Sequence, residues 1–269
     1  MQLYYREIGT GTPLVILHGL YGSSDNWITI GRELSSKYRV ILVDQRNHGQ
    51  SPHSPSHSYN HLAEDLLELL QSLGLSKIIL MGHSMGGKTA MLFASRFPEM
   101  ISKLIVVDIS PASYSNSKDF TSQERVHQQI ITSLLSLNIE ALTSRQQADE
   151  LLAKMIPDLR VRQFLLKNLK RESDGKFVWM LNLDSISQNL YQLMDSIFVG
   201  MDNVKIQIPT LFIKGEKSPY ITPNHEDVIK NHFENYQLVS IPNAGHWVHA
   251  EQPVQFLEAV NQFLDSSNS

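Results

Sequence analysis

The sequence predicts an α/β protein in which helices cover both faces of a mostly parallel central sheet and a helical cap is inserted. In the first 110 residues, short apolar runs alternate with segments of helical periodicity. This alternation is typical of parallel strands that are buried on both faces. Residues 111–203 contain helix-like segments and no clear strand, and alternation resumes afterwards. We therefore expect a core formed by 1–110 and 204–269, with a cap, or lid, at 111–203.

The expected strands are short apolar runs bounded by polar or turn residues. They lie at 2–8, 14–17, 40–43, 78–81, 104–107, 210–214 and 237–241. The expected helices carry apolar residues at spacings of three and four. They lie at 25–36, 62–73, 85–97, 122–137, 145–155, 158–170, 184–198, 223–233 and 251–264. The first strand alternates apolar and polar residues, which predicts a position at the sheet edge.

The composition indicates an ordinary globular protein of 269 residues, with 42% apolar and 19% charged residues. A net charge of −4 without a basic stripe argues against a nucleic-acid partner. Cysteine is absent, which excludes disulfides and thiolate chemistry. No signal-peptide pattern and no apolar run near the roughly 20 residues of a membrane span is visible. We expect a cytoplasmic protein without stable membrane insertion, and its oligomeric state is unknown from the sequence.

One stretch, residues 77–88, joins a predicted strand directly to a predicted helix. It contains Gly82-His-Ser84-Met-Gly86, the G-x-S-x-G pattern of a nucleophile elbow. The glycines on both sides of Ser84 lack the Cβ atoms that would clash in a tight bend. Ser84 at the apex is therefore the candidate nucleophile.

The same letters satisfy a second pattern. Residues 82–89 also read G-x-x-x-x-G-K-[ST], the phosphate-binding loop. In that interpretation Lys88 and Thr89 would contact phosphate and magnesium, and Asp108 would be a magnesium ligand at the end of a strand. A nucleotide hydrolase of this kind would leave the other polar turns of the chain without a role.

Acyl transfer uses those turns. It needs a nucleophile, a histidine base, an acid that orients the base, and donors for the oxyanion. His246 follows the last predicted strand, and the chain order serine, aspartate, histidine is that of α/β hydrolases. The backbone N–H groups of Leu20 and Met85 could form the oxyanion hole, since Met85 opens the helix after the elbow.

Together these motifs resemble the α/β-hydrolase superfamily over nearly the whole chain. The motifs are His18-Gly19, Asp44-Gln-Arg-Asn-His-Gly-Gln-Ser51, Gly82-His-Ser-Met-Gly-Gly87 and Ile241-Pro-Asn-Ala-Gly-His246. Within the superfamily the chain is most similar to bacterial carboxylesterases of the YbfF type. This closer resemblance involves Arg46-Asn-His-Gly49, Gly87-Lys88, Ser218-Pro-Tyr220 and Gly245-His-Trp-Val-His-Ala-Glu251.

The position of the acid departs from the common pattern. Many relatives carry Gly-x-x-Asp after the strand at 210–214, whereas this chain has Gly215-Glu-Lys-Ser218. A serine cannot stabilise an imidazolium by charge, so Asp108, at the end of the strand after the elbow helix, is the best substitute. The YbfF-type resemblance also implies Asp108 as the acid, with Ser218 as a fourth, hydrogen-bonding member near His246. Glu216 is the alternative acid.

These observations predict a serine esterase that acts on a small-molecule carboxylic ester or acyl-thioester through an acyl-enzyme on Ser84. Neither a cofactor nor a metal is needed. A C–C bond hydrolase with the same triad, a nucleotide hydrolase using 82–89, and a non-catalytic binding module remain alternatives. In the esterase interpretation, Lys88 and Thr89 are ordinary helix residues and His48 has a structural role in its turn. Selectivity for acyl length would depend on how the 111–203 cap closes.

Overall fold

The computed structural model describes residues 1–115, 123–200 and 204–266. Its strands are β1 (Tyr5–Ile8), β2 (Thr12–Leu17), β3 (Tyr38–Val43), β4 (Ile78–His83), β5 (Ile101–Val107), β6 (Leu169–Arg171), β7 (Phe177–Trp179), β8 (Thr210–Gly215) and β9 (Tyr236–Ile241). Its α-helices are α1 (Ile28–Leu34), α2 (Tyr59–Ser72), α3 (Met85–Arg96), α4 (Gln123–Leu135), α5 (Arg145–Leu152), α6 (Leu159–Leu166), α7 (Leu183–Met194), α8 (Pro223–His232), α9 (Val248–Glu251) and α10 (Pro253–Asp265). Short 3-10 helices are η1 (Ser24–Trp27), η2 (Pro98–Met100) and η3 (Ile139–Ala141).

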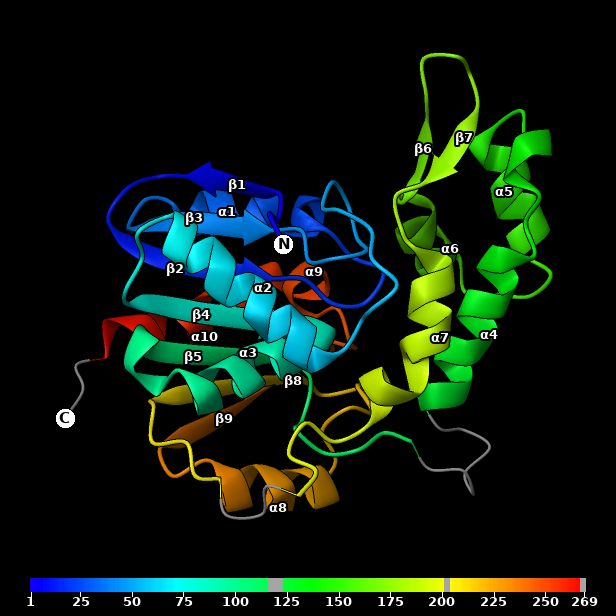
Figure 1. The fold of residues 1–269 in the computed structure, drawn as a ribbon. Helices are drawn as coiled ribbons and strands as arrows, with labels where there is room; N and C mark the ends of the chain where they lie inside the picture. Colours follow the sequence, from blue (N-terminus) through cyan, green and yellow to red (C-terminus); the bar gives the residue numbers. More distant parts are fainter. Residues whose placement is uncertain (116–122, 201–203, 267–269) are drawn as a thin grey trace.

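The central sheet has the strand order β1-β3-β2-β4-β5-β8-β9 (Figure 1). Only β1 at one edge is antiparallel to its neighbour within the described residues, with Tyr5 opposite Val43. All other neighbouring pairs in this sheet are parallel, so the carboxyl ends of β2, β4, β5, β8 and β9 meet at one edge. The prediction of a mostly parallel α/β sheet is confirmed.

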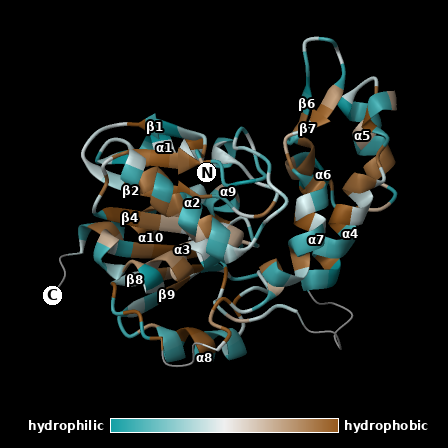
Figure 2. Ribbon diagram, viewed as in Figure 1, coloured by the Kyte–Doolittle hydropathy of each residue, from teal (hydrophilic) through white to brown (hydrophobic). Residues whose placement is uncertain are grey.

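Helices cover both faces of this sheet. On one face, Val15 and Leu17 of β2 pack in a core with residues of α2 and α3. On the other face, Leu14 and Ile16 of the same strand pack with residues of α1 and α10. Figure 2 shows the result, with hydrophobic residues concentrated on the strands between the two helical layers. This double burial explains why the strands read as continuous apolar runs instead of alternating ones.

Helices α4 to α7 form a layer beside the carboxyl edge of the sheet (Figure 1). The prediction that 111–203 contains no strand is wrong, because β6 pairs with β7 in an antiparallel hairpin there. The helix predicted at 158–170 ends at Leu166 for the same reason. The hairpin turn contains Gly175 at φ +88°, a backbone conformation that suits glycine. The predicted helix start at 122 and the cap end at 201–203 lie outside the described residues.

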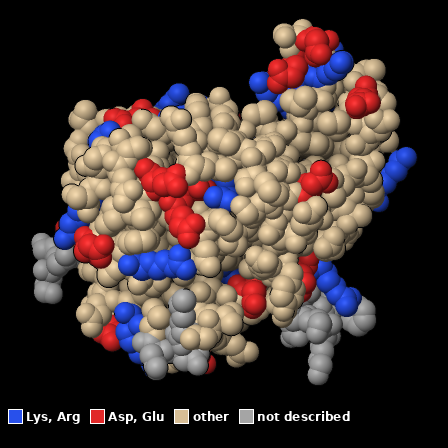
Figure 3. All heavy atoms as spheres, viewed as in Figure 1, with Lys and Arg blue, Asp and Glu red and all other residues tan. Residues whose placement is uncertain are grey.

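Charged side chains are mixed in sign on the face shown in Figure 3. At the tip of the β6–β7 hairpin, Lys170 pairs with Glu172 at 3.0 Å and Lys176 with Asp174 at 3.7 Å. A bilayer-spanning helix is not found in the three described ranges.

Candidate active site

The elbow is a strained turn between β4 and α3. Ser84 has φ 52° and ψ −118°, which is unusual for a residue with a side chain. A Cβ atom on Gly82 would lie 2.2 Å from the Gly86 carbonyl oxygen, and one on Gly86 would lie 2.4 Å from the carbonyl oxygen of Leu17. Only glycine fits at either position, so the flanking glycines of the motif are required by packing.

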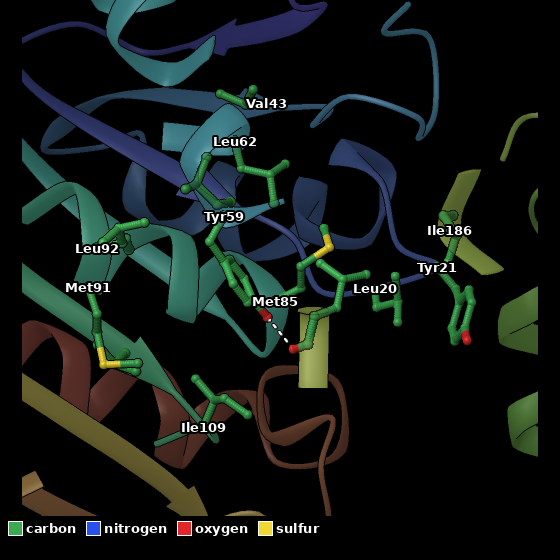
Figure 4. Packing of buried hydrophobic residues seen from close by; sticks show 14 of the residues in the cluster. Leu20, Tyr21, Val43, Tyr59, Leu62, Met85, Met91, Leu92, Ile109 and Ile186 are labelled. Carbon is green, nitrogen blue, oxygen red and sulfur yellow. Dashed lines mark hydrogen bonds between the residues drawn. The ribbon is translucent and has the colours of Figure 1, made fainter. Parts of the chain in front are cut away.

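Two residues that share a cavity with Ser84 have backbone N–H groups without an acceptor in the described part of the protein. Among the described residues, neither the N–H of Leu20 nor that of Met85 donates a hydrogen bond. Met85 is the first residue of α3, where N–H groups have no partner within the helix. Leu20, Ser84 and Met85 line the same cavity, and Figure 4 shows Leu20 and Met85 next to each other. The structure therefore places both residues that are predicted to supply the oxyanion donors at the same cavity as the predicted nucleophile.

The carboxylate of Asp108 accepts hydrogen bonds from two other segments of the chain. It is completely buried at the end of β5. Its Oδ2 atom lies 2.7 Å from His246 Nδ1 and accepts a short hydrogen bond from the Ser218 hydroxyl. Its Oδ1 atom accepts the N–H of Gly215 at 2.9 Å. Three of the predicted site residues, Asp108, His246 and Ser218, thus form one hydrogen-bonded group.

His246 is held so that its second nitrogen is free. Because a carboxylate can only accept, His246 Nδ1 carries a proton, and in the neutral imidazole Nε2 is then the nitrogen with the lone pair. The ring stacks on Tyr220 at 3.9 Å between centroids, and the His83 ring lies 4.6 Å away. His83 Nε2 donates to the His246 carbonyl oxygen at 2.9 Å, which fixes the loop. The Ser84 hydroxyl has no hydrogen-bond partner within the described part of the chain, as is common before a substrate binds.

Glu216, the alternative acid, lies elsewhere. Its Oε2 atom accepts the N–H of Asn243 at 2.9 Å, and its side chain is exposed. It makes no contact with His246 that would orient the imidazole.

The cavity at Ser84 is small and apolar. It measures about 10 Å³, which is room for one water molecule. Its walls come from the core and from α4 and α7, namely Leu20, Tyr59, Ser84, Met85, Lys88, Ile109, Tyr114, His127, Leu193, Met194 and Tyr220.

Lys88 also lines this cavity, which the sequence did not predict. The side chain is 1% exposed, and burial lowers the pKa of its ammonium to about 7. Its Nζ atom donates to the Asp195 carbonyl oxygen at 2.5 Å and lies 4.8 Å from the centre of the Tyr114 ring.

Lys88 is one of three groups outside α7 that bind the carbonyls at the end of this helix. The Tyr59 hydroxyl donates to the Leu193 carbonyl oxygen at 2.8 Å, a bond drawn in Figure 4. The Tyr114 N–H donates to the next carbonyl oxygen, that of Met194, at 2.7 Å. A helix leaves its last carbonyls without internal partners, and these donors satisfy them. The end of α7 is therefore anchored on the elbow helix and its surroundings.

The same contacts argue against the phosphate-loop interpretation. Lys88 is engaged with the end of α7, and the Thr89 hydroxyl donates to the Met85 carbonyl oxygen at 3.0 Å. The carboxylate of Asp108 is engaged with His246 and Ser218. None of the three groups proposed for nucleotide and magnesium faces an open phosphate site.

Several histidines around the site are buried and neutral. Burial lowers the pKa of His18 to about 4, and that of His48 and His249 to about 3. His249 stacks on Trp27 at 4.0 Å, and its ring has no charged partner to stabilise a proton. The sequence shows these histidines but not their burial, because their surroundings come from distant segments.

We expect the free energy of unfolding to fall steeply as the pH drops below 6.5. In the unfolded chain, these histidines have the ordinary pKa of about 6.5, so the unfolded state binds protons that the folded state does not. Stability is complete above pH 6.5 and is lost as the pH falls through the folded pKa values of about 4 and about 3. These three groups alone give a slope of roughly 4 kcal/mol per pH unit, and His57, His83 and His127, whose pKa burial also lowers, make it steeper. Urea unfolding at a series of pH values, monitored by circular dichroism, measures this change in the free energy of unfolding.

A matched pair of variants tests the cause of this slope. His249→Phe keeps the aromatic stack and should reduce the slope by about 1.4 kcal/mol per pH unit, since one contributing group is removed. His53→Gln changes an exposed histidine of the 51–58 loop and should leave the slope as it is. A wild-type stability that is flat between about pH 6.5 and about pH 4.5 would contradict the burial argument.

Comparisons with known proteins define the class. A family model described as alpha/beta hydrolase fold matches residues 12–128. The mouse sn-1-specific diacylglycerol lipase ABHD11 is 39% identical over 257 residues, which cover 93% of this chain and 80% of the relative. The chain belongs to the α/β-hydrolase superfamily.

Within the superfamily the chain is similar to YbfF, as the motifs predicted. Esterase YbfF of Escherichia coli is 33% identical over 255 residues, covering 94% of this chain and 93% of the relative. A solved structure described as a marine microorganism esterase has a TM-score of 0.92 and 44% identity, and it covers 97% of this chain and 99% of its own. These relatives are named as esterases and lipases.

Proposed function

We propose that the chain is a carboxylesterase-type serine hydrolase that cleaves carboxylic esters, or acyl-thioesters, through an acyl-enzyme on Ser84. One observation carries the proposal. The 2.7 Å contact between His246 Nδ1 and Asp108 fixes the imidazole tautomer, so that Nε2 can act as a base at the elbow. The esterases and lipases among the relatives support the same reaction class.

In the first half-reaction, the Ser84 hydroxyl oxygen attacks the acyl carbonyl carbon and His246 Nε2 takes the hydroxyl proton. The carbonyl oxygen becomes an oxyanion that accepts the N–H groups of Leu20 and Met85, which need no reorganisation to meet it. The buried carboxylate of Asp108 stabilises the imidazolium that forms. His246 then gives its proton to the leaving alcohol or thiol, and the acyl group stays on Ser84.

In the second half-reaction, water attacks the acyl carbon while His246 Nε2 takes a proton from it. His246 then gives that proton to the Ser84 oxygen, the bond between this oxygen and the acyl carbon breaks, and the carboxylic acid is released. Ser218 acts through Asp108, because its hydroxyl occupies the same carboxylate oxygen as His246. It holds the carboxylate in place and keeps its charge directed at the imidazole. No metal or cofactor takes part in any of these steps.

We propose that residues 111–203 act as the cap that admits the acyl group. The cavity of about 10 Å³ is smaller than an acyl group, which supports a role for the walls that α4 and α7 contribute in admitting the substrate. The C-terminal end of α7 is anchored as described above, and its N-terminal end is bonded to the 47–55 loop through Asn182 and Ser185. Movement of α7 would therefore break one of these two sets of hydrogen bonds, and we propose that the extent of this opening sets the acyl length accepted.

The test combines turnover with covalent labelling. We expect hydrolysis of p-nitrophenyl esters across a series of acyl lengths, with a burst of p-nitrophenol if deacylation is slow. A fluorophosphonate should label the protein once, and peptide mass mapping should place the label on Ser84.

Each alternative has its own outcome. Absence of both turnover and label would favour a non-catalytic binding module. Cleavage of a C–C bond in a 1,5-diketone with inert esters would favour a C–C bond hydrolase. Magnesium-dependent ATP turnover that survives Ser84→Ala but not Lys88→Ala would favour the nucleotide hydrolase.

A further inference from the structure

We propose that His48 is a positioning residue for the oxyanion hole. Its neutral imidazole holds the N–H of Tyr21 and thereby fixes residues 18–22, here called the oxyanion loop, with the Leu20 N–H turned to Ser84. The inference rests on the proposed function, since it concerns the donor assigned there to Leu20. It gives a role to the 44–51 motif, which the triad does not use.

The hydrogen bonds of His48 define its tautomer. Its Nδ1 atom lies 2.9 Å from the Arg46 carbonyl oxygen, and a carbonyl can only accept, so Nδ1 carries the proton. Its Nε2 atom then has a bare lone pair and accepts the Tyr21 N–H at 3.2 Å. His48 is completely buried, so no solvent water replaces that acceptor.

A second histidine joins the same two loops. His18 Nδ1 donates to the Gly19 carbonyl oxygen at 2.8 Å, and its Nε2 accepts the N–H of Gln45 at 3.0 Å. The Gln45 side chain returns a hydrogen bond to the His18 carbonyl oxygen at 2.7 Å. Hydrogen bonds therefore hold the oxyanion loop against the 44–51 turn.

The loop needs such support because its backbone is strained. Tyr21 has φ +62°, in the left-handed region that side-chain-bearing residues disfavour. Without restraint, this residue would relax to negative φ and turn the preceding peptide, which contains the Leu20 carbonyl. His48 holds the Tyr21 N–H, and Asn168 at the end of α6 donates to the Tyr21 carbonyl oxygen at 2.8 Å. The strained residue is clamped on both sides.

Neutral imidazole is required for this clamp. If Nε2 were protonated, it would be a second donor facing the Tyr21 N–H, and the hydrogen bond between them would be lost. The groups that face the ring are His18, His57 and the Arg46 main chain, with His53 farther off, and no carboxylate is among them. Burial and these histidines lower the pKa of His48, so the acceptor persists throughout the neutral range.

Two amide substitutions separate the two nitrogens of His48. Glutamine can place its oxygen near the position of Nε2 and keep the acceptor for Tyr21. Asparagine reaches only to the position of Nδ1, so it keeps the donor to Arg46 and loses that acceptor. We expect His48→Asn to lower kcat on a p-nitrophenyl ester about 10- to 100-fold with KM within about threefold, since a displaced oxyanion donor acts on the transition state. His48→Gln should recover kcat to within about fivefold of wild type.

Affinity for a boronic acid, which forms a tetrahedral anion on serine, should fall by the same factor as kcat/KM in His48→Asn and recover in His48→Gln. Equal kcat in wild type and a folded His48→Asn, or equal losses in both variants, would overturn the positioning role. In that case wild-type turnover and phosphonate labelling would leave the proposed esterase function intact.

A measurement on the unaltered protein covers the event that a variant does not fold. Long-range ¹⁵N–¹H spectra of ¹⁵N-histidine-labelled protein should show His48 with a protonated Nδ1 and a bare Nε2. The opposite tautomer, or a doubly protonated ring at neutral pH, would overturn the proposal whatever the variants do.

Discussion

Ser84→Ala should lower kcat for ester hydrolysis by about 10⁶-fold, the largest effect expected of any single substitution here. The substitution removes the atom that forms the acyl-enzyme, and only the oxyanion donors and binding remain to accelerate attack by water. Substrate binding should change little, because the hydroxyl makes no hydrogen bond in the described structure and contributes little to the cavity wall. Steady-state kinetics and loss of fluorophosphonate labelling measure the effect.

Ser95→Ala is the matched control, since Ser95 lies on the same helix and its hydroxyl only donates to the Leu92 carbonyl oxygen at 2.8 Å. It should keep full activity and labelling in protein prepared the same way. Retention of more than about one hundredth of wild-type kcat by Ser84→Ala would mean that another group is the nucleophile.

The strained turn at Ser84 was predictable because its signals are local. A buried strand, two glycines and a helix start lie within about ten residues, and the structure has the strained turn that this pattern requires. The mostly parallel sheet was predictable for a related reason. Strands buried on both faces are apolar throughout, so each is visible without knowledge of its neighbours.

The acid was harder, because its identity depends on which strand ends meet. Asp108 and Ser218 are 110 residues apart in the chain, yet they share a hydrogen bond. Strand order brings them together, since β5 and β8 are adjacent and parallel. The sequence offered the absence of an aspartate at 218, the position of Asp108 at the end of a predicted strand, and the resemblance to esterases of the YbfF type.

Other features had no usable signal. β6 and β7 have three residues each, too few for a period of two to be distinguished from the end of a helix. Lys88 read as an ordinary helix residue because the groups that enclose it, Tyr114 and the end of α7, come from far along the chain. The burial of His48 is hidden for the same reason.

Asp108→Asn should lower kcat by about 10⁴-fold with a small change in KM. The amide cannot accept the His246 Nδ1 proton as a carboxylate does, so the imidazole loses its tautomer and the imidazolium loses its counter-charge. The backbone supports a folded variant, because Asp108 has φ 51° and asparagine tolerates this left-handed conformation well. Circular dichroism and thermal unfolding verify that the fold is kept.

Two further substitutions test whether the loss of activity is specific to Asp108. Glu216→Gln should leave kcat within about threefold, since Glu216 contacts Asn243 and not the imidazole. Ser218→Ala should cost about tenfold, because Asp108 loses one donor but keeps Gly215 and His246. A loss within about tenfold for Asp108→Asn together with a large loss for Glu216→Gln would transfer the acid to Glu216. A small loss for both would mean that neither carboxylate orients the imidazole, and the base itself would have to be sought elsewhere.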